Sequence, residues 1–306
     1  WRDGDKKCEG EIIEILGNAY DSGIDVLCVL RKYGISQEFP QVVIDEARSL
    51  IPGITGDEIA RREDFRTKTV ITIDGTDAKD LDDAVCAERI DGGYELSVHI
   101  ADVSHYVREN SPIDAEAFRR GTSVYFTDRV VPMLPVELSN NICSLNPHTN
   151  KLTLSVVMEI SDDGELLSHR VVEGVISTAH RMTYDTVDKM LLGDSETCAE
   201  YADIKDNILL MRELADILKT NRKKSGSIDF DFPETKIEVD QNGKPTNVYK
   251  YRTGVSNGII EEFMLMANRT VAEAFYWLEV PFIYRIHEKP SADKIANFNS
   301  FLANMN

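Results

Sequence analysis

The sequence predicts an α+β protein in which a mixed sheet packs against helices, and three observations carry this prediction. Residues 151–160 alternate apolar and polar side chains, and residues 166–176 follow across an Asp-Asp-Gly turn, which predicts a hairpin of two long strands. Residues 70–73 form an apolar, β-branched run that is typical of a buried strand. In residues 255–278 apolar side chains recur at every fourth position, which predicts a long helix with one face toward the core.

The first fifty residues are expected to contain strands followed by a helix. Residues 11–16 and 23–30 have the apolar composition of strands, with a turn at Gly17. Residues 42–50 have helical spacing, and the Ile-Pro-Gly sequence at residues 51–53 marks a break. We therefore divide the chain into residues 1–50 and residues 51–306.

The middle of the chain alternates strands with short helices. Residues 94–103 are expected to form a strand. A helix is expected to begin at Ser111, because serine caps helices, proline follows at the first position and aspartate stands at the third. Residues 122–126 are short and β-prone, and Pro132 and Pro135 stiffen the loop after them.

The last third of the chain adds a second hairpin and further helices. Residues 228–239 and 247–251 are expected to pair through the Asn-Gly sequence at residues 242–243. The other predicted elements are helices over residues 183–192, 198–219 and 291–306 and a strand over residues 281–286.

The composition indicates a soluble globular protein. The 306 residues suffice for one large domain or two ordinary ones, with 42% hydrophobic and 28% charged residues. No apolar run approaches the ~20 residues of a membrane span, and no signal peptide is recognisable. The five cysteines are scattered and never form a C-x-x-C motif, so we expect reduced thiols and a cytoplasmic location.

Two features bear on partners. A net charge of −19 weighs against nucleic acid, because phosphate contacts normally come from a basic patch. The sequence begins at Trp1, and the helix predicted at residues 291–306 has no stop signal. We therefore expect a fragment cut at both ends, with part of any nucleic-acid affinity outside it.

Residues 74–83, DGTDAKDLDD, place five aspartates in ten positions. Two carboxylates ~4 Å apart repel by ~1 kcal/mol in water and by ~4 kcal/mol at the effective dielectric of a partly buried site. The apolar run at residues 70–73 and the apolar Leu81, Ala84 and Val85 put the acids at the edge of the core. Protons or cations must neutralise them there, and a divalent metal is the simpler remedy at pH 7.

The acidic stretch has two other interpretations. A solvated acidic loop needs no ligand and stays open. An EF-hand calcium loop fails, because Lys79 stands where glycine is required and Val85 where glutamate is required. Short aspartates suit Mg²⁺, with Mn²⁺ as the alternative, and leave coordination positions for water and phosphate oxygens.

The acidic stretch and six later blocks resemble the RNB-type exoribonucleases of the ribonuclease II and ribonuclease R family, and look most like the ribonuclease R branch. In family terms residues 1–50 resemble the tail of a cold-shock-type OB barrel with a connector, and residues 51–306 a truncated RNB-type catalytic domain. The blocks are HIADVSHYV at residues 99–107, RGTSVYF at 120–126, VPMLP at 131–135, CSLNP at 143–147, EEFMLMAN at 261–268 and YRIHE at 284–288.

The resemblance implies Mg²⁺-dependent hydrolysis of single-stranded RNA from its 3′ end, with release of nucleoside 5′-monophosphates. Matched to the motif, Asp74, Asp80 and Asp83 are expected to be mainly metal ligands. Asp82 is the acid whose loss is expected to lower turnover most. For Asp77, simple capping of a turn is an open alternative.

Gathering the four acids requires a turn. In an extended segment Asp80 and Asp82 point the same way and Asp83 points the opposite way, so one flat strand cannot bring all of them together. Gly75 permits the turn that the site needs.

Two residues are implicated in RNA contacts by the resemblance. Tyr125 resembles an aromatic that stacks on the terminal base, although an aromatic in a strand is more often core, and Phe126 is the better candidate for burial. Glu262, on the polar side of the long helix, resembles an acid that contacts a ribose hydroxyl. Glu261 is an alternative, and a solvated helix face is an alternative for both.

Four further residues have two possible roles, one in binding a phosphate and one in the structure. Arg285 and His287 alternate on one predicted strand face, where they can contact a phosphate or form a structural pair. His99 and Asp102 are similarly ambiguous.

The chain departs from the family pattern near its end. The family's serine, proline and arginine-rich signature and its terminal RNA-binding barrel are not found before Asn306. We therefore expect this chain to bind metal but degrade RNA poorly by itself. The rival functions are an RNA-binding scaffold with an inactive nuclease fold and another metal-dependent phosphodiesterase. Expected partners are single-stranded RNA and the ribosome or RNA-decay proteins.

Overall fold

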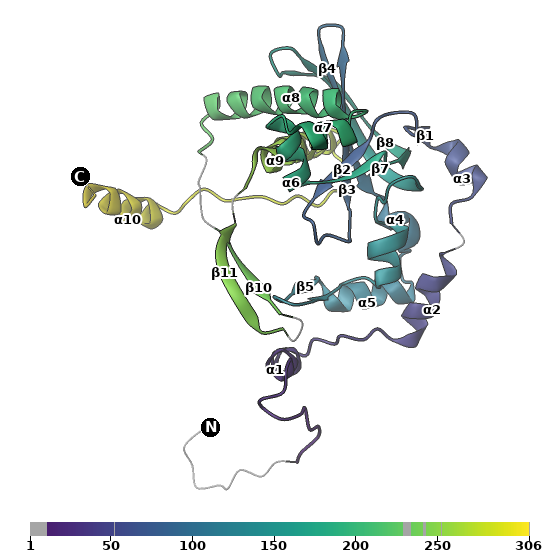
Figure 1. Ribbon diagram of the computed structural model, residues 1–306, viewed down its shortest axis with the longest axis vertical. Helices are drawn as coiled ribbons and strands as arrows, with labels where there is room; N and C mark the ends of the chain where they lie inside the picture. Colours follow the sequence, from purple (N-terminus) through teal and green to yellow (C-terminus); the bar gives the residue numbers. More distant parts are fainter. Residues whose placement is uncertain (1–10, 52, 229–233, 241–242, 252, 306) are drawn as a thin grey trace. The chain divides into compact units, whose positions relative to one another are not determined.

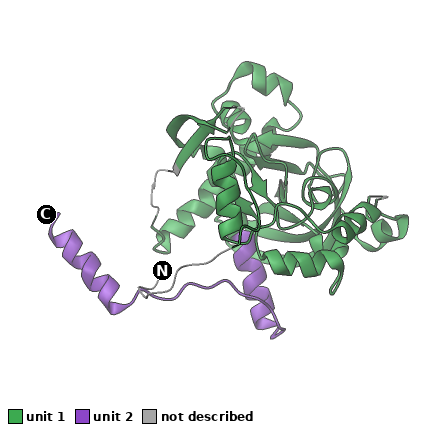
Figure 2. Cartoon of the chain, turned by 90° about the horizontal axis from the view of Figure 1, so that it is seen from below, with its two compact units in different colours: residues 1–265 green, residues 266–306 purple. Residues whose placement is uncertain are grey.

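The computed structural model describes residues 11–51, 53–228, 234–240, 243–251 and 253–305. The chain divides into two compact units, residues 1–265 and residues 266–306 (Figure 2). The helix α9 (Val255–Trp277) contains the boundary between them. No helix in the described part of the chain is long and apolar enough to cross a membrane.

The first unit is organised around a mixed sheet of seven strands in the order β1-β8-β7-β4-β3-β2-β9 (Figure 1). Neighbours pair antiparallel, except that β1 is parallel to β8 and β2 is parallel to β9. The strands are β1 (Glu63–Asp64), β2 (Ile71–Asp74), β3 (Asp83–Ile90), β4 (Gly93–Ala101), β7 (Asn150–Ser161), β8 (Leu166–Ser177) and β9 (His180–Thr183).

Helices cover the sheet because most central strand residues are apolar on both faces. On β3, Ala84 through Ala87 are all buried. Residues of α2, α4 and α5 share one core cluster with β3 and β7. On α8, Asn207 donates a hydrogen bond of 2.7 Å to the Ala87 carbonyl of β3. The helices of the first unit are α1 (Ile24–Lys32), α2 (Gln41–Ser49), α3 (Gly56–Arg61), α4 (Val103–Tyr106), α5 (Pro112–Arg120), a π-helix (Leu138–Ile142), α6 (Tyr184–Leu191), α7 (Ser195–Glu200) and α8 (Lys205–Lys224).

Two small hairpins complete the first unit. β5 (Val124–Tyr125) pairs with β6 (Val130–Val131), and β10 (Glu234–Val239) pairs with β11 (Pro245–Tyr251). The predicted turn residue Asn242 lies outside the described residues. In the second unit, α10 (Ala292–Ala303) follows the end of α9.

Several local signals in the sequence act as expected. The Ser111 hydroxyl accepts a hydrogen bond from the Asp114 amide, so α5 begins where the cap predicts. β7 and β8 form the predicted long hairpin. On α9, the predicted core residues Ile259 and Phe263 are almost fully buried.

Four predicted elements are wrong. Residues 23–30 form helix α1 instead of a strand, with Asp25 in the first turn and Arg31 and Lys32 in the last, where each complements the helix dipole. Residues 198–219 are split, because the chain turns over residues 201–204 between α7 and α8. Residues 11–16 and 281–286 are not strands, since neither segment has a partner strand among the described residues, and strands need one.

Candidate active site

The candidate site lies where two neighbouring strands of the sheet meet. β2 ends at Asp74, β3 begins at Asp83, and the acid loop, residues 75–82, joins them. β2 and β3 are antiparallel with Ile71 opposite Val85, so Asp74 and Asp83 lie at adjacent strand ends. The sequence thus confines its acids to one edge of the core, as predicted.

The acid loop turns back without using the special freedom of glycine. A turn forms at its start, where the Ala78 amide donates a hydrogen bond of 3.1 Å to the Gly75 carbonyl. Gly75 is not among the glycines with a positive φ angle. The expected turn is therefore present, but its backbone is one that any L-residue can adopt.

Burial and mutual repulsion raise the pKa values of the acids. The pKa of Asp74 is raised to about 7, first by burial and then by the negative charge of Asp83, while the Arg181 guanidinium partly opposes the shift. Burial also raises the pKa of Asp83, and burial with the charges of Asp80 and Asp83 raises the pKa of Asp82. A site that raises the pKa of several carboxyl groups favours a proton or a cation.

A cavity of about 1150 Å³ opens beside the acid loop. Asp80 and Asp82 line it together with Tyr125 and Arg181, whereas Asp74 and Asp83 are not among its lining residues. Two of the four predicted acids, Asp80 and Asp82, therefore line the cavity. The other two, Asp74 and Asp83, lie at the strand ends where the acid loop begins and ends.

The side chains of the acids have the chemistry to bind a hard divalent cation, but they are not already arranged as a complete coordination site. Among the described residues no three acidic, histidine or cysteine side chains are arranged as a metal site. The donor set is nevertheless all carboxylate oxygen, which Mg²⁺ prefers. One Asp74 oxygen, Oδ2, is buried without a hydrogen-bond partner. Such a group needs a ligand that the protein atoms do not supply.

Tyr125 presents its ring to the same cavity. It lies on β5 and is 68% exposed, while its neighbour Phe126 is partly buried. Partial burial raises the pKa of Tyr125, and the negative charges of Asp80 and Asp82 raise it further. An exposed aromatic beside the acids has the position that base stacking requires.

Glu262 does not lie on a polar, solvated helix face. Its side chain is 4% exposed, and Arg222 Nη2 contacts its Oε1 at 2.6 Å. A buried carboxylate such as that of Glu262 needs a charged partner, and Arg222 of α8 is that partner. Glu262 lines a separate cavity of about 290 Å³ rather than the acid cavity, and its neighbour Glu261 is exposed. The solvated alternative is therefore wrong for Glu262, whereas Glu261 is exposed and its contact with RNA stays a prediction.

Arg285 and His287 belong to the second unit. Both are exposed in a segment without regular structure, so the expected alternation on a strand face is wrong. Their contact with a phosphate stays a prediction.

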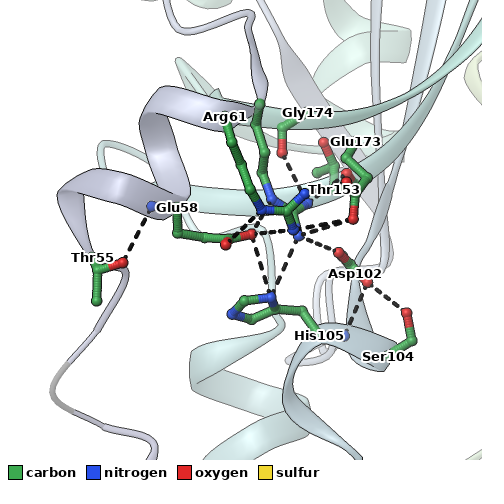
Figure 3. A network of polar contacts seen from close by, with 10 residues as sticks. Thr55, Glu58, Arg61, Asp102, Ser104, His105, Thr153, Glu173 and Gly174 are labelled. Atoms are coloured by element: carbon green, nitrogen blue, oxygen red, sulfur yellow. Dashed lines mark hydrogen bonds and ion pairs between the residues drawn. The ribbon is translucent and has the colours of Figure 1, made fainter.

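His99 and Asp102 are structural. Asp102 is 2% exposed, contacts Arg62 Nη2 at 2.6 Å and caps α4 through the His105 amide (Figure 3). His99 is fully buried with its Nδ1 2.7 Å from the Ser155 hydroxyl, and burial lowers the pKa of His99 to about 3. A neutral, enclosed imidazole of this kind cannot reach a substrate.

Comparison with known proteins decides the family. The RNB domain family matches residues 62–306. The chain belongs to the RNB domain family. The predicted RNB-type fold is thus confirmed, and the cold shock domain family matches residues 1–40 of the same RNB protein. The boundary expected near residue 50 stays a prediction.

The RNB chain is similar to several proteins named ribonuclease R. Ribonuclease R 1 of Lactococcus lactis is 52% identical over 296 residues, which cover 96% of this chain and 36% of that protein. A Mycoplasma genitalium ribonuclease R in complex with ribose methylated single-stranded RNA has a TM-score of 0.87 at 32% identity, covering 94% of this chain and 45% of that one. The same enzyme in complex with double-stranded RNA has a TM-score of 0.88 at 31% identity, covering 95% and 52%. This RNB chain therefore spans between a third and about half of those relatives.

Proposed function

We propose that this chain carries the catalytic centre of a 3′-to-5′ exoribonuclease that releases nucleoside 5′-monophosphates with the help of Mg²⁺, or of Mn²⁺ in its place. One observation carries the proposal: Asp74 has a buried oxygen without a partner, next to Asp83 and to the acid loop that lines the large cavity. This arrangement favours a cation as an alternative to a proton, and a cation beside a nucleotide-sized cavity suits phosphodiester chemistry.

The acids have distinct proposed roles. Asp74, Asp80 and Asp83 hold the metal, which when bound activates water and stabilises charge on the departing oxygen. Asp82 is exposed at the cavity wall, where its carboxylate orients the attacking water or the scissile phosphate. Tyr125 stacks on the terminal base, and stacking accepts any base, as a sequence-independent exonuclease requires.

RNA is proposed as the substrate on two grounds. The relatives are named ribonuclease R, and two of their structures contain RNA. The cavity also provides positive charge close to the acids, from Lys79, Arg129 and Arg181. Local cations of this kind favour a phosphate backbone even in a protein whose net charge is −19.

Single-turnover digestion tests the proposal. The chain, in excess over 5′-labelled single-stranded RNA or DNA of the same sequence, is incubated with Mg²⁺ or with EDTA. Because the chain by itself is expected to degrade RNA poorly, we expect slow, stepwise shortening of the labelled RNA from its 3′ end, only when metal is present. Asp82→Asn is expected to lower the rate by a factor on the order of 100 or more, since it removes a group that acts at the reacting atoms.

Asp91→Asn is the matched control, because Asp91 is an exposed aspartate that follows the other end of β3 and does not line the cavity. It is expected to retain the rate within about twofold, as surface substitutions usually do. Binding of RNA without any shortening supports the scaffold alternative, and equal digestion of DNA supports a general phosphodiesterase. Either result overturns the proposal.

A further inference from the structure

The backbone on both sides of Asp80 is held by one buried side chain from elsewhere in the chain. The Ser144 hydroxyl donates a hydrogen bond of 3.0 Å to the Lys79 carbonyl and accepts one of 3.1 Å from the Leu81 amide. Lys79 and Leu81 are the residues immediately before and after Asp80. Ser144 therefore fixes the one peptide segment from which Asp80 projects.

Neighbouring backbone groups extend this hold toward Asp82. The Leu145 amide donates to the Leu81 carbonyl at 2.8 Å, and the Ala101 amide donates to the Asp82 carbonyl at 2.9 Å. These two bonds come from backbone, which any residue supplies. Ser144, in contrast, holds the segment through its side chain, as Arg181 does earlier in the acid loop by donating to the Ala78 carbonyl at 2.6 Å.

Ser144 is itself rigidly placed. It is fully buried, and it follows Cys143, which lines the acid cavity. The π-helix before it ends in carbonyl groups that the buried Lys151 ammonium binds, at 2.5 Å for Asn141 and 3.2 Å for Ile142. Lys151 belongs to β7, so its contacts connect the segment before Ser144 to the sheet. Through Ser144 the acid loop is connected to the same strand.

The acid loop needs such a hold because its charges repel one another. Asp80 and Asp82 are exposed on the same cavity, and without a restraint their repulsion favours a loop in which they separate. A metal site requires its ligands within about 0.5 Å of their bound positions before the ion arrives.

We infer that Ser144 is a positioning residue of the proposed metal site, whose hydroxyl holds the Asp80 carboxylate where a divalent cation binds. The inference rests on the proposed function, because it assigns Asp80 to the metal. Ser144→Ala leaves the buried Leu81 amide and the partly buried Lys79 carbonyl without this partner, which favours a movement of the loop that regains hydrogen bonds.

The test compares Ser144→Ala with Ser155→Ala in the 306-residue chain. Ser155 is a matched control, since it is also buried and its hydroxyl also has two partners, His99 at 2.7 Å and Thr153 at 2.9 Å, neither of them in the acid loop. Mn²⁺ binding is followed by electron paramagnetic resonance. Amide hydrogen exchange is followed by NMR without metal, and thermal unfolding shows whether each variant is folded.

For Ser144→Ala we expect the Mn²⁺ dissociation constant to rise by about 10- to 100-fold, as it does when an outer-shell partner is lost. The Leu81 amide is expected to exchange faster without metal. For Ser155→Ala we expect less than about a twofold change in Mn²⁺ affinity and an unchanged Leu81 amide, even if both variants melt at a similarly lowered temperature. Should Ser144→Ala fail to fold, Ser144→Cys retains a weak donor and acceptor of similar size and is expected to give a smaller loss of affinity.

Two results would overturn the inference, and they are distinguishable. If the unaltered chain binds Mn²⁺ but Ser144→Ala and Ser155→Ala bind it equally well, Ser144 has no positioning role and the proposed function stands. If the unaltered chain does not bind Mn²⁺, the proposed metal site fails and the inference fails with it.

Discussion

Asp74 is a buried acid that opposes folding of the metal-free protein, and the proposed function makes it a metal ligand. The ordinary pKa of its carboxyl group is 3.8. In the folded, metal-free protein, burial and the nearby charge of Asp83 raise the pKa of Asp74 to about 7. Between these values the unfolded chain has lost the proton that the folded chain retains. The free energy of unfolding of the metal-free protein therefore falls as the pH rises from about 4 to 7, and the contribution is constant above that range.

Asp74→Asn is expected to stabilise the metal-free chain while abolishing tight Mn²⁺ binding. A pKa shift from 3.8 to about 7 corresponds to at most about 4 kcal/mol at pH 8, and because the carboxyl group is partly exposed we expect a gain on the order of 1 to 3 kcal/mol, with a smaller gain at pH 5. Urea unfolding in EDTA at both pH values measures the gain. Asp77→Asn, in the exposed part of the same loop, is the control and is expected to change little. An equal gain at both pH values would contradict this account of Asp74.

At this scale the sequence predicted that the acids lie at one edge of the core, but not which of them line the cavity; their roles stay predictions. The crowded motif identified Asp74, Asp80, Asp82 and Asp83, because their spacing is local. Which of them line the cavity depends on the path of the acid loop, which distant segments determine. Glu262 was misplaced for the same reason, since its partner Arg222 lies 40 residues earlier.

At the scale of elements, a buried ion network joins α3 and β1 to the central sheet. The Arg62 side chain is fully buried and contacts Glu58 at 2.6 Å and Asp102 at 2.6 Å. It also donates to the Thr153 carbonyl of β7 at 3.2 Å. Asp102 in turn caps α4, whose first residue, Val103, lines the acid cavity. The network thus braces one wall of the candidate site.

Arg62→Met is expected to lower the free energy of unfolding by about 3 to 5 kcal/mol, because it leaves the buried Asp102 carboxylate without its charged partner, whereas Glu58 keeps its contact with Arg61. Urea unfolding at pH 7 measures the loss. Arg66→Met is the control: Arg66 contacts Asp64 at 2.7 Å, but both side chains are largely exposed, so its loss is expected to matter little. A loss for Arg62→Met no larger than for the control would show that the network contributes nothing to stability.

Elements were predicted best where local signals agree. The Ser111 cap and the β7–β8 hairpin depend on residues close in sequence, and both are present. Residues 23–30 were misassigned because a short apolar run fits a helix or a strand equally well, and only its surroundings decide. The Arg62 network was missed, since no pattern links an arginine to an acid 40 residues away.

At the scale of the whole molecule, folding and metal binding are expected to be coupled. The chain carries a net charge of −19, and the proposed site concentrates part of that charge at one place. A ligand that binds only the folded state raises the free energy of unfolding by about 2.7 kcal/mol at 100 times its dissociation constant. Metal is therefore expected to stabilise the molecule beyond any general effect of salt.

Titration with Mg²⁺ during thermal unfolding tests this coupling. The unfolding temperature of the unaltered chain is expected to rise with Mg²⁺ and to return to its starting value with EDTA. Na⁺ at the same ionic strength controls for screening, and Asp83→Asn is expected to respond more weakly to Mg²⁺. The same rise with Na⁺ as with Mg²⁺ would mean that screening alone accounts for the effect.

The sheet order itself could not be predicted. The sequence indicated several strands correctly, but the parallel pairing of β2 with β9 joins segments more than a hundred residues apart in the numbering. No local pattern reports such a pairing, which depends on the packing of the complete core.

The way the acid loop is fastened also has a consequence for how the protein is made. Ser144 lies 65 residues beyond Lys79, and Arg181, which donates to the Ala78 carbonyl at 2.6 Å, lies 103 residues beyond it. During synthesis the aspartates of the acid loop are made long before Ser144 and Arg181. The nascent chain therefore cannot form the proposed metal site until most of the sheet has folded. If the proposed function holds, metal binding and any nuclease activity can therefore arise only late in folding.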